Sequence, residues 1–227
     1  ANNKVLEIIQ KDLRLKKLPV LMECFDNSNT QGNFPVAACV VFKNGKPLKK
    51  EYRHFNIKSV EGPDDFASME EVILRRYSRL IKEKKELPQL IVIDGGKGQL
   101  SSALKSLQKL KLDKRIAVIG IAKRLEEIFF PGDQYPLYLD KKTPTLKVIQ
   151  SMRNEAHRFG ITHHRNKRLK GLIKTELRTI HGIGDKTAME LLKKYKSVNK
   201  IKLIPLKELE NLIGKDKANK VYYALHN

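Results

Sequence analysis

The stretches VLMECFD (residues 20–26) and LIVIDGGKG (residues 90–98) decide the fold of this chain. Each begins as an apolar run long enough for a buried β-strand, and each run ends in an aspartate, Asp26 or Asp94. A buried carboxylate is costly to desolvate unless it caps a turn, bonds a neighbour or binds a cation. If the two strands are parallel neighbours, both aspartates lie at the carboxyl edge of one sheet, where open sheets bind their ligands.

Such a pair of carboxylates predicts a divalent-metal site. The two negative charges repel one another at close range, and a divalent cation removes that repulsion. Oxygen ligands favour Mg²⁺ or Mn²⁺ as the cofactor. The alternative is that each aspartate only caps the turn that follows it, and we prefer the metal site because the two strands end in the same way.

The segments around these two strands predict an α/β domain. Apolar patterns indicate further strands over residues 35–42, 52–57 and 116–121, a tight turn at Asn44-Gly45, and another hairpin over residues 128–139. Helical periodicity marks residues 5–13, 64–80, 99–110 and 143–162. The order is an antiparallel three-strand meander followed by helix, strand, helix and strand. It predicts a mixed sheet flanked by helices.

We expect three segments: an N-terminal helix and linker (residues 1–18), the α/β domain (residues 19–168) and a small all-α domain (residues 169–227). A basic, loosely patterned composition between residues 165 and 174 indicates the second boundary. Because the sequence does not begin with Met, we also expect it to be part of a longer protein.

The charge is strongly positive, since 46 Lys and Arg against 25 Asp and Glu give a formal net charge of +21. A polyanion would relieve this self-repulsion, and nucleic acid is therefore the expected partner. A membrane is not expected, because there is no apolar segment of roughly 20 residues and no basic amphipathic helix with aromatic anchors. Cys24 and Cys39 lie in apolar runs without metal-ligand spacing, which indicates buried thiols in a reducing compartment, the cytoplasm.

The last part of the chain carries a helix-hairpin-helix signature. Apolar residues at helical spacing flank Ile180-His181-Gly182-Ile183-Gly184. The glycines keep the hairpin open to a phosphate, and the free amides of the following helix bind it together with Lys186. Such contacts hold DNA without reading its sequence. Residues 206–225 suggest a second copy with Asp216 in place of the second glycine, which either contacts DNA or mainly completes the core.

Other candidate positions each have a structural alternative. The glycines after Asp94 offer amide donors for a phosphate beside Lys97, although such turns also occur for backbone geometry alone. The pair Asp64-Asp65 opens a helix, where helix capping is the alternative. His157 lies between Arg153 and Arg158 on a helix, and a lone histidine is more often structural.

Four segments together resemble the endonuclease domain of the UvrC family. They are ECFDxS (residues 23–28), GPDDF (62–66), VIDGGKGQ (92–99) and RNEAHRF (153–159). The resemblance implies a ribonuclease H-like fold that cuts DNA 5′ to a lesion in nucleotide excision repair. It implies Asp26, Asp94 and His157 as the catalytic triad, with His157 as metal ligand or general base, and Asp65 as a further acidic residue. One departure is Asn29, where the family usually has His.

The family further implies damaged double-stranded DNA and UvrB as partners, with UvrA acting upstream. Its N-terminal nuclease domain, which makes the 3′ cut, has no counterpart in this sequence. The residues leave two other functions open: a DNA-binding module without catalysis, and another nuclease of the same fold, such as a ribonuclease or a recombinase. The expected DNA contacts are Lys97, Arg153, Arg158, Gly182, Gly184 and Lys186.

Overall fold

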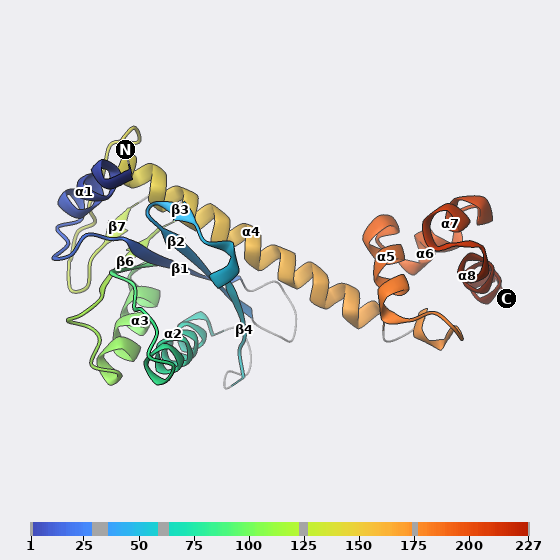
Figure 1. Cartoon of the computed structure of the whole chain (residues 1–227). Coiled ribbons are helices and arrows are strands. Elements are labelled where there is room, and N and C mark those ends of the chain that lie inside the picture. The colour runs from blue at the N-terminus through green and yellow to red at the C-terminus, as the bar shows by residue number, and fades with distance from the viewer. Residues whose placement is uncertain (1, 29–35, 59–63, 123–126, 174–176, 227) are drawn as a thin grey trace. The chain divides into compact units, whose positions relative to one another are not determined.

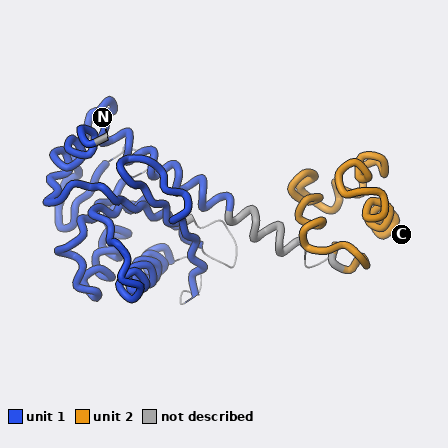
Figure 2. Tube along the Cα trace, viewed as in Figure 1, with its two compact units in different colours: residues 1–162 blue, residues 163–227 orange. Residues whose placement is uncertain are grey.

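The computed structural model describes residues 2–28, 36–58, 64–122, 127–173 and 177–226. The chain forms two compact units, residues 1–162 and 163–227 (Figure 2). The boundary falls inside helix α4 (Pro144–Ile173), which continues beyond the end expected near residue 162. The expected functional division between residues 168 and 169 stays a prediction.

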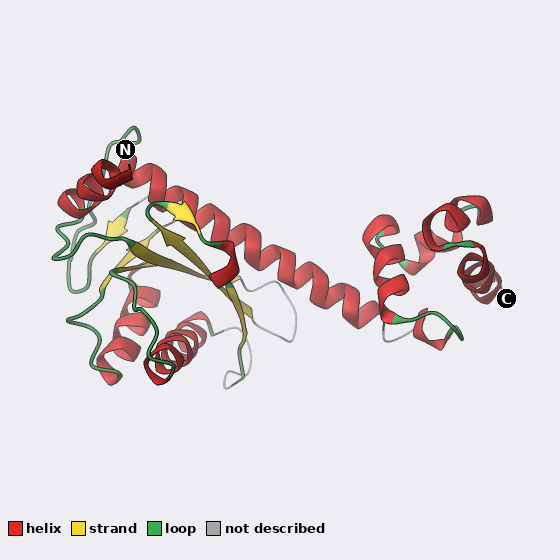
Figure 3. Cartoon of the chain, viewed as in Figure 1, coloured by secondary structure: helices red, strands yellow, loops and turns green. Residues whose placement is uncertain are grey.

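Unit 1 is built on one mixed sheet with helices on both sides (Figures 1 and 3). The spatial order of its strands is β3-β2-β1-β5-β6-β7, and β4 also pairs with β2. Strands β1, β5 and β6 are parallel neighbours, whereas the other pairs are antiparallel. The expected mixed sheet is therefore confirmed. The strands are β1 (Leu21–Ser28), β2 (Val36–Lys43), β3 (Lys46–Pro47), β4 (Arg53–Asn56), β5 (Leu90–Asp94), β6 (Ala117–Ile121) and β7 (Ile128–Phe129).

The return from β2 differs from the single strand expected over residues 52–57. Asn44 and Gly45 form the expected tight turn, both with positive φ, but it leads only into the two-residue strand β3. Pro47 has no N–H to donate to the ladder, and the chain turns through the 3₁₀ helix η1 (Lys49–Glu51). Strand β4 then pairs with the other end of β2. Similarly, the hairpin expected over residues 128–139 is reduced to β7 and one bridge between Ile128 and Leu137.

The helices bury their apolar stripes against the two faces of this sheet. Helices α2 (Asp65–Lys82) and α3 (Lys97–Lys109) pack together on one face, and α4 crosses the other (Figure 1). Helix α1 (Asn2–Asp12) buries Leu6 and Ile9 in the same core, so the segment before β1 belongs to unit 1.

Unit 2 has a hydrophobic core of its own. The sequence predicted a first helix of the hairpin around Leu177, and the described residues there form the 3₁₀ turn η2 (Leu177–Thr179). The expected second helical pair is present as α7 (Leu206–Ile213) and α8 (Lys215–His226), joined at Gly214. Within the part of the chain that the structure describes, no helix is both long and apolar enough to cross a membrane. The helices are α5 (Asp185–Tyr195), α6 (Val198–Lys202), α7 (Leu206–Ile213) and α8 (Lys215–His226).

Candidate active site

Asp26 and Asp94 lie side by side at the carboxyl edge of the sheet. They are register partners in the parallel pair β1–β5, as expected from the matching ends of the two apolar runs. Their exposed fractions are only 1% and 4%. Two carboxylates are thus held close together in a largely dehydrated place, where their mutual repulsion is strong.

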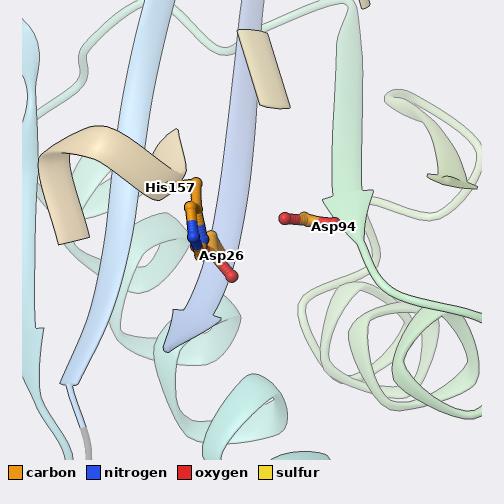
Figure 4. A group of neighbouring side chains, drawn as sticks. All are labelled: Asp26, Asp94 and His157. Atoms are coloured by element: carbon orange, nitrogen blue, oxygen red, sulfur yellow. The ribbon is translucent and has the colours of Figure 1, made fainter. Parts of the chain in front are cut away.

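The third member of the cluster, His157, comes from α4. Its Nδ1 lies 3.1 Å from Asp26 Oδ2, and half of its side chain is exposed. Figure 4 shows the imidazole directly beside Asp26, with Asp94 on the neighbouring strand. Ligand atoms of the three residues all lie within 4.8 Å of one another, and no other such group occurs among the described residues.

This donor set fits a divalent cation. Asp26 Oδ1 is buried and has no hydrogen-bond partner among the described residues, a costly state that a bound cation would relieve. An ionised carboxylate only accepts hydrogen bonds, so the contact with His157 requires a proton on Nδ1. The two carboxylate oxygens suit Mg²⁺ or Mn²⁺, and an imidazole nitrogen as third ligand favours Mn²⁺ of the two.

Cys24 lies on β1 two residues before Asp26, so its side chain is on the same face of the sheet as the cluster. It is unsuited to be a metal ligand. It is fully buried, and burial raises the pKa of its thiol well above the usual value. The negative charges of Asp94 and Asp26 raise this pKa further. The soft sulfur of a thiol is also a poor ligand for Mg²⁺ or Mn²⁺, which the two carboxylates favour. Cys24 and Cys39 are both free and buried, as expected from the sequence.

Asp65 is close to the end of β1 but lies outside the three-residue cluster. It is the first residue of α2, and its backbone oxygen accepts a hydrogen bond from Asn27 Nδ2 at 2.9 Å. The helix cap is the preceding Asp64, whose Oδ1 accepts from the amides of Phe66 and Ala67. Capping, the structural alternative for this acidic pair, is therefore carried by Asp64. Sequence reasoning missed Asn27, although it directly follows Asp26.

The expected basic contacts of unit 1 have partners within the chain. Lys97 donates to the backbone oxygen of Gln134, and Arg158 forms two 2.7 Å hydrogen bonds with Glu155, which lower the pKa of that carboxyl. Arg153 donates to Asn154 at 3.2 Å. Its charge partly offsets the burial that raises the pKa of Cys24, which places Arg153 near the cluster.

The hairpin residues of unit 2 have different structural roles. Gly182 has a φ of +86°, which an L-residue with a side chain rarely adopts. Gly184 precedes α5 with no side-chain cap and with open space around the position of a Cβ. Lys186 is exposed in the first turn of α5. Binding of a phosphate by the amides of this helix end stays a prediction of the hairpin signature. Asn29, the departure from the family pattern, lies outside the described residues.

The family model for the UvrC RNAse H endonuclease domain matches residues 10–161. The chain belongs to this family. The match covers the whole sheet and α4 as far as the turn after His157. It therefore includes all of the UvrC-like segments of unit 1, and unit 2 lies beyond it.

Relatives of this UvrC domain match almost the whole chain. The UvrABC system protein C of Flavobacterium psychrophilum is 63% identical over 96% of the chain, and that of Christiangramia forsetii is 64% identical over 95%. The chain spans only 37% and 36% of those relatives, respectively. Among solved structures, human ENDOV has a TM-score of 0.42 and 13% identity over 65% of this chain and 85% of its own. An Endonuclease_V from Bacillus subtilis has a TM-score of 0.33 and 13% identity over 70% and 91%.

Proposed function

We propose that this chain is the nuclease part of a nucleotide-excision-repair protein and hydrolyses a phosphodiester of damaged double-stranded DNA 5′ to the lesion. The observation that carries the proposal is the cluster of Asp26, Asp94 and His157 at the carboxyl edge of the sheet. Membership of the UvrC endonuclease family supports the reaction, and the name of its relatives supports the repair pathway. The net charge of +21 supports a DNA substrate.

Asp26, Asp94 and His157 would hold Mg²⁺ or Mn²⁺, each offering one ligand atom. The bound cation would stabilise negative charge on the phosphate and lower the pKa of a coordinated water. Asp26 orients the imidazole through its contact with Nδ1. If that Nδ1–H bond persists in the reacting complex, Nε2 carries the one free lone pair of the ring. His157 would then act either as the third ligand or, with the cation held by the two aspartates, as the acceptor of a proton from the attacking water.

The basic residues would bind the DNA backbone rather than read its bases. In unit 2, the backbone amides at the start of α5, after Gly184, and the charge of Lys186 would bind one phosphate. In unit 1, we propose phosphate contacts for Lys97, Arg153 and Arg158, which would exchange their present partners for phosphate oxygens. Asp65, held beside the end of β1 by Asn27, would assist the same incision.

By family resemblance, UvrB is the proposed partner that brings this nuclease to the lesion, with UvrA acting earlier. The cytoplasm is the proposed location, and the two free buried thiols are compatible with a reducing compartment.

The test is nicking of supercoiled plasmid by this chain with Mg²⁺ or Mn²⁺, using EDTA as the metal-free control. Asp26→Asn and Asp94→Asn should abolish nicking but keep the fold and DNA affinity, because they remove metal ligands and retain side-chain size. Asp113→Asn is the matched control, since this aspartate follows α3 at the other end of β6 from the cluster. DNA binding without nicking would favour the non-catalytic module.

Two further substrates separate the nucleases of this fold. The first is a lesion-bearing duplex, which is incubated with UvrA, UvrB and the longer protein that contains this segment. We expect incision 5′ to the lesion. An RNA–DNA hybrid should be a poor substrate. Preferential cutting of the hybrid would overturn the repair assignment in favour of a ribonuclease.

A further inference from the structure

The candidate cluster belongs to a row of residues that runs across four strands. Asp94 is the register partner of Asp26, Asp26 of Ala38, and Ala38 of His54. Directly opposed residues on neighbouring strands point to the same face of a sheet. His54 therefore faces α4 on the same side as the two aspartates, with only the small side chain of Ala38 between it and Asp26.

Helix α4 contacts this row at two points that are two residues apart in its sequence. His157 meets Asp26 at one point, and Phe159 meets His54 at the other. The rings of His54 and Phe159 are stacked with centroids 3.6 Å apart and an interplanar angle of 17°. His54 Nε2 also lies 2.9 Å from the Phe159 backbone oxygen, and a carbonyl can only accept, so the ring donates this bond.

Tyr52 completes the attachment of this helical turn. Its ring meets the edge of Phe159 with centroids 5.1 Å apart. Aromatic pairs at these separations add stabilisation beyond their buried area. By contrast, half of the His157 side chain is exposed, and among the described residues its one side-chain hydrogen bond is with Asp26. Met152 and Ala156, both fully buried, anchor α4 before His157, and Phe159 anchors it after His157. The position of His157 above the sheet therefore depends on both anchors.

We propose that His54 is a positioning residue for His157: by holding Phe159 it fixes the turn of α4 that brings His157 to Asp26 and Asp94. This inference rests on the proposed nuclease function for its catalytic readout. A misplacement of about 1 Å in a reacting group can lower a rate by roughly 100-fold. His54 itself stays two strands away from Asp26 and does not touch the reacting atoms.

The variants separate the two contacts of the ring. His54→Phe keeps the stacking on Phe159 and removes the hydrogen bond, His54→Gln keeps a donor and removes the ring, and His54→Ala removes both. The matched control is Phe55→Ala, the next residue of β4. Phe55 is half-buried and points to the other face of the sheet, where Arg75 lies 5.6 Å from its ring.

The main readout is the kcat and KM of Mn²⁺-dependent nicking, measured well below the Tm of each variant. We expect His54→Ala to lower kcat by about 10- to 100-fold with little change in KM, and the other two variants to lie between it and the native chain. Phe55→Ala should leave kcat within about threefold of the native value. In a His157→Ala background, His54→Ala should cause little further loss, because it acts through His157. An equal further loss in that background would overturn the proposal.

A second readout does not depend on activity. The ring ¹⁵N and ¹H NMR signals of His157 should shift in His54→Ala and stay in place in Phe55→Ala. Unchanged His157 signals in a folded His54→Ala variant would overturn the positioning role. If the native chain never nicks DNA but these signals still shift, the proposed function fails and the positioning role stands.

Discussion

The ion pair between Glu23 and Arg76 predicts one of the largest losses of stability available in unit 1. It joins β1 to α2 on the face opposite to the catalytic cluster, and the exposed fractions of the two residues are 1% and 7%. Arg76 Nη2 lies 2.6 Å from Glu23 Oε1, and Tyr77 donates its hydroxyl to Glu23 Oε2 at 2.7 Å. Arg76→Met leaves a buried carboxylate without its cation, which should cost about 3–5 kcal/mol.

The double variant Glu23→Leu, Arg76→Met should behave very differently. Replacing both charges with apolar groups is neutral or stabilises by about 1–4 kcal/mol. The Tyr77 hydroxyl then loses its acceptor, which costs about 1–3 kcal/mol, so the two effects nearly cancel. The double variant should therefore be more stable than Arg76→Met alone, although it carries one more substitution.

The stability of both variants is measured by thermal unfolding of unit 1. Unfolding is monitored through the circular dichroism of the tyrosines and through hydrogen exchange of the β1 amides. For a unit of this size, each kcal/mol lowers Tm by about 2–4 °C, so Arg76→Met should lower it by about 6–20 °C. Hydrogen exchange separates unit 1 from unit 2, whose helices unfold around a different core. A loss below about 2 °C, or a double variant as unstable as the single one, would refute the reasoning.

Three further predictions concern the site and the DNA contacts. Asp64→Ala should lower the free energy of unfolding by about 1 kcal/mol, because α2 loses its cap, and should leave nicking unchanged. Asp65→Ala should reduce nicking without changing the Tm. The reverse pattern would assign the function to Asp64. Gly184→Val should keep unit 2 folded, as judged by circular dichroism, and weaken DNA binding, whereas Gly182→Val should also lower stability by about 1–2 kcal/mol because its φ is positive; normal DNA affinity of folded Gly184→Val would make the hairpin purely structural. Finally, log K for duplex DNA should fall linearly with log salt with a slope of several units and little sequence dependence, and a flat response in a binding titration would contradict phosphate contacts.

Several features were predictable because they depend on local sequence. The apolar runs before Asp26 and Asp94 predicted two buried strands, and both are present as a parallel pair whose ladder ends at the two aspartates. Strand β5 ends at Asp94 as predicted, whereas β1 continues two residues past Asp26 to Ser28. The tight turn at Asn44-Gly45 follows from residues that tolerate positive φ. By contrast, the short β3 and the shift of β4 to the other end of β2 were missed, since strand pairing depends on partners distant in sequence.

The sequence by itself determined the elements that carry the chemistry, because hydrophobic periodicity and strand-end carboxylates are local properties of the chain. Only the tertiary structure decided which of these residues meet. It placed His157 on Asp26 across 131 positions of sequence, set His54 in the same row of the sheet, and gave the cap of α2 to Asp64 rather than Asp65. Such contacts arise from strand register and from the way a helix crosses a sheet, and both are set by the packing of the whole core.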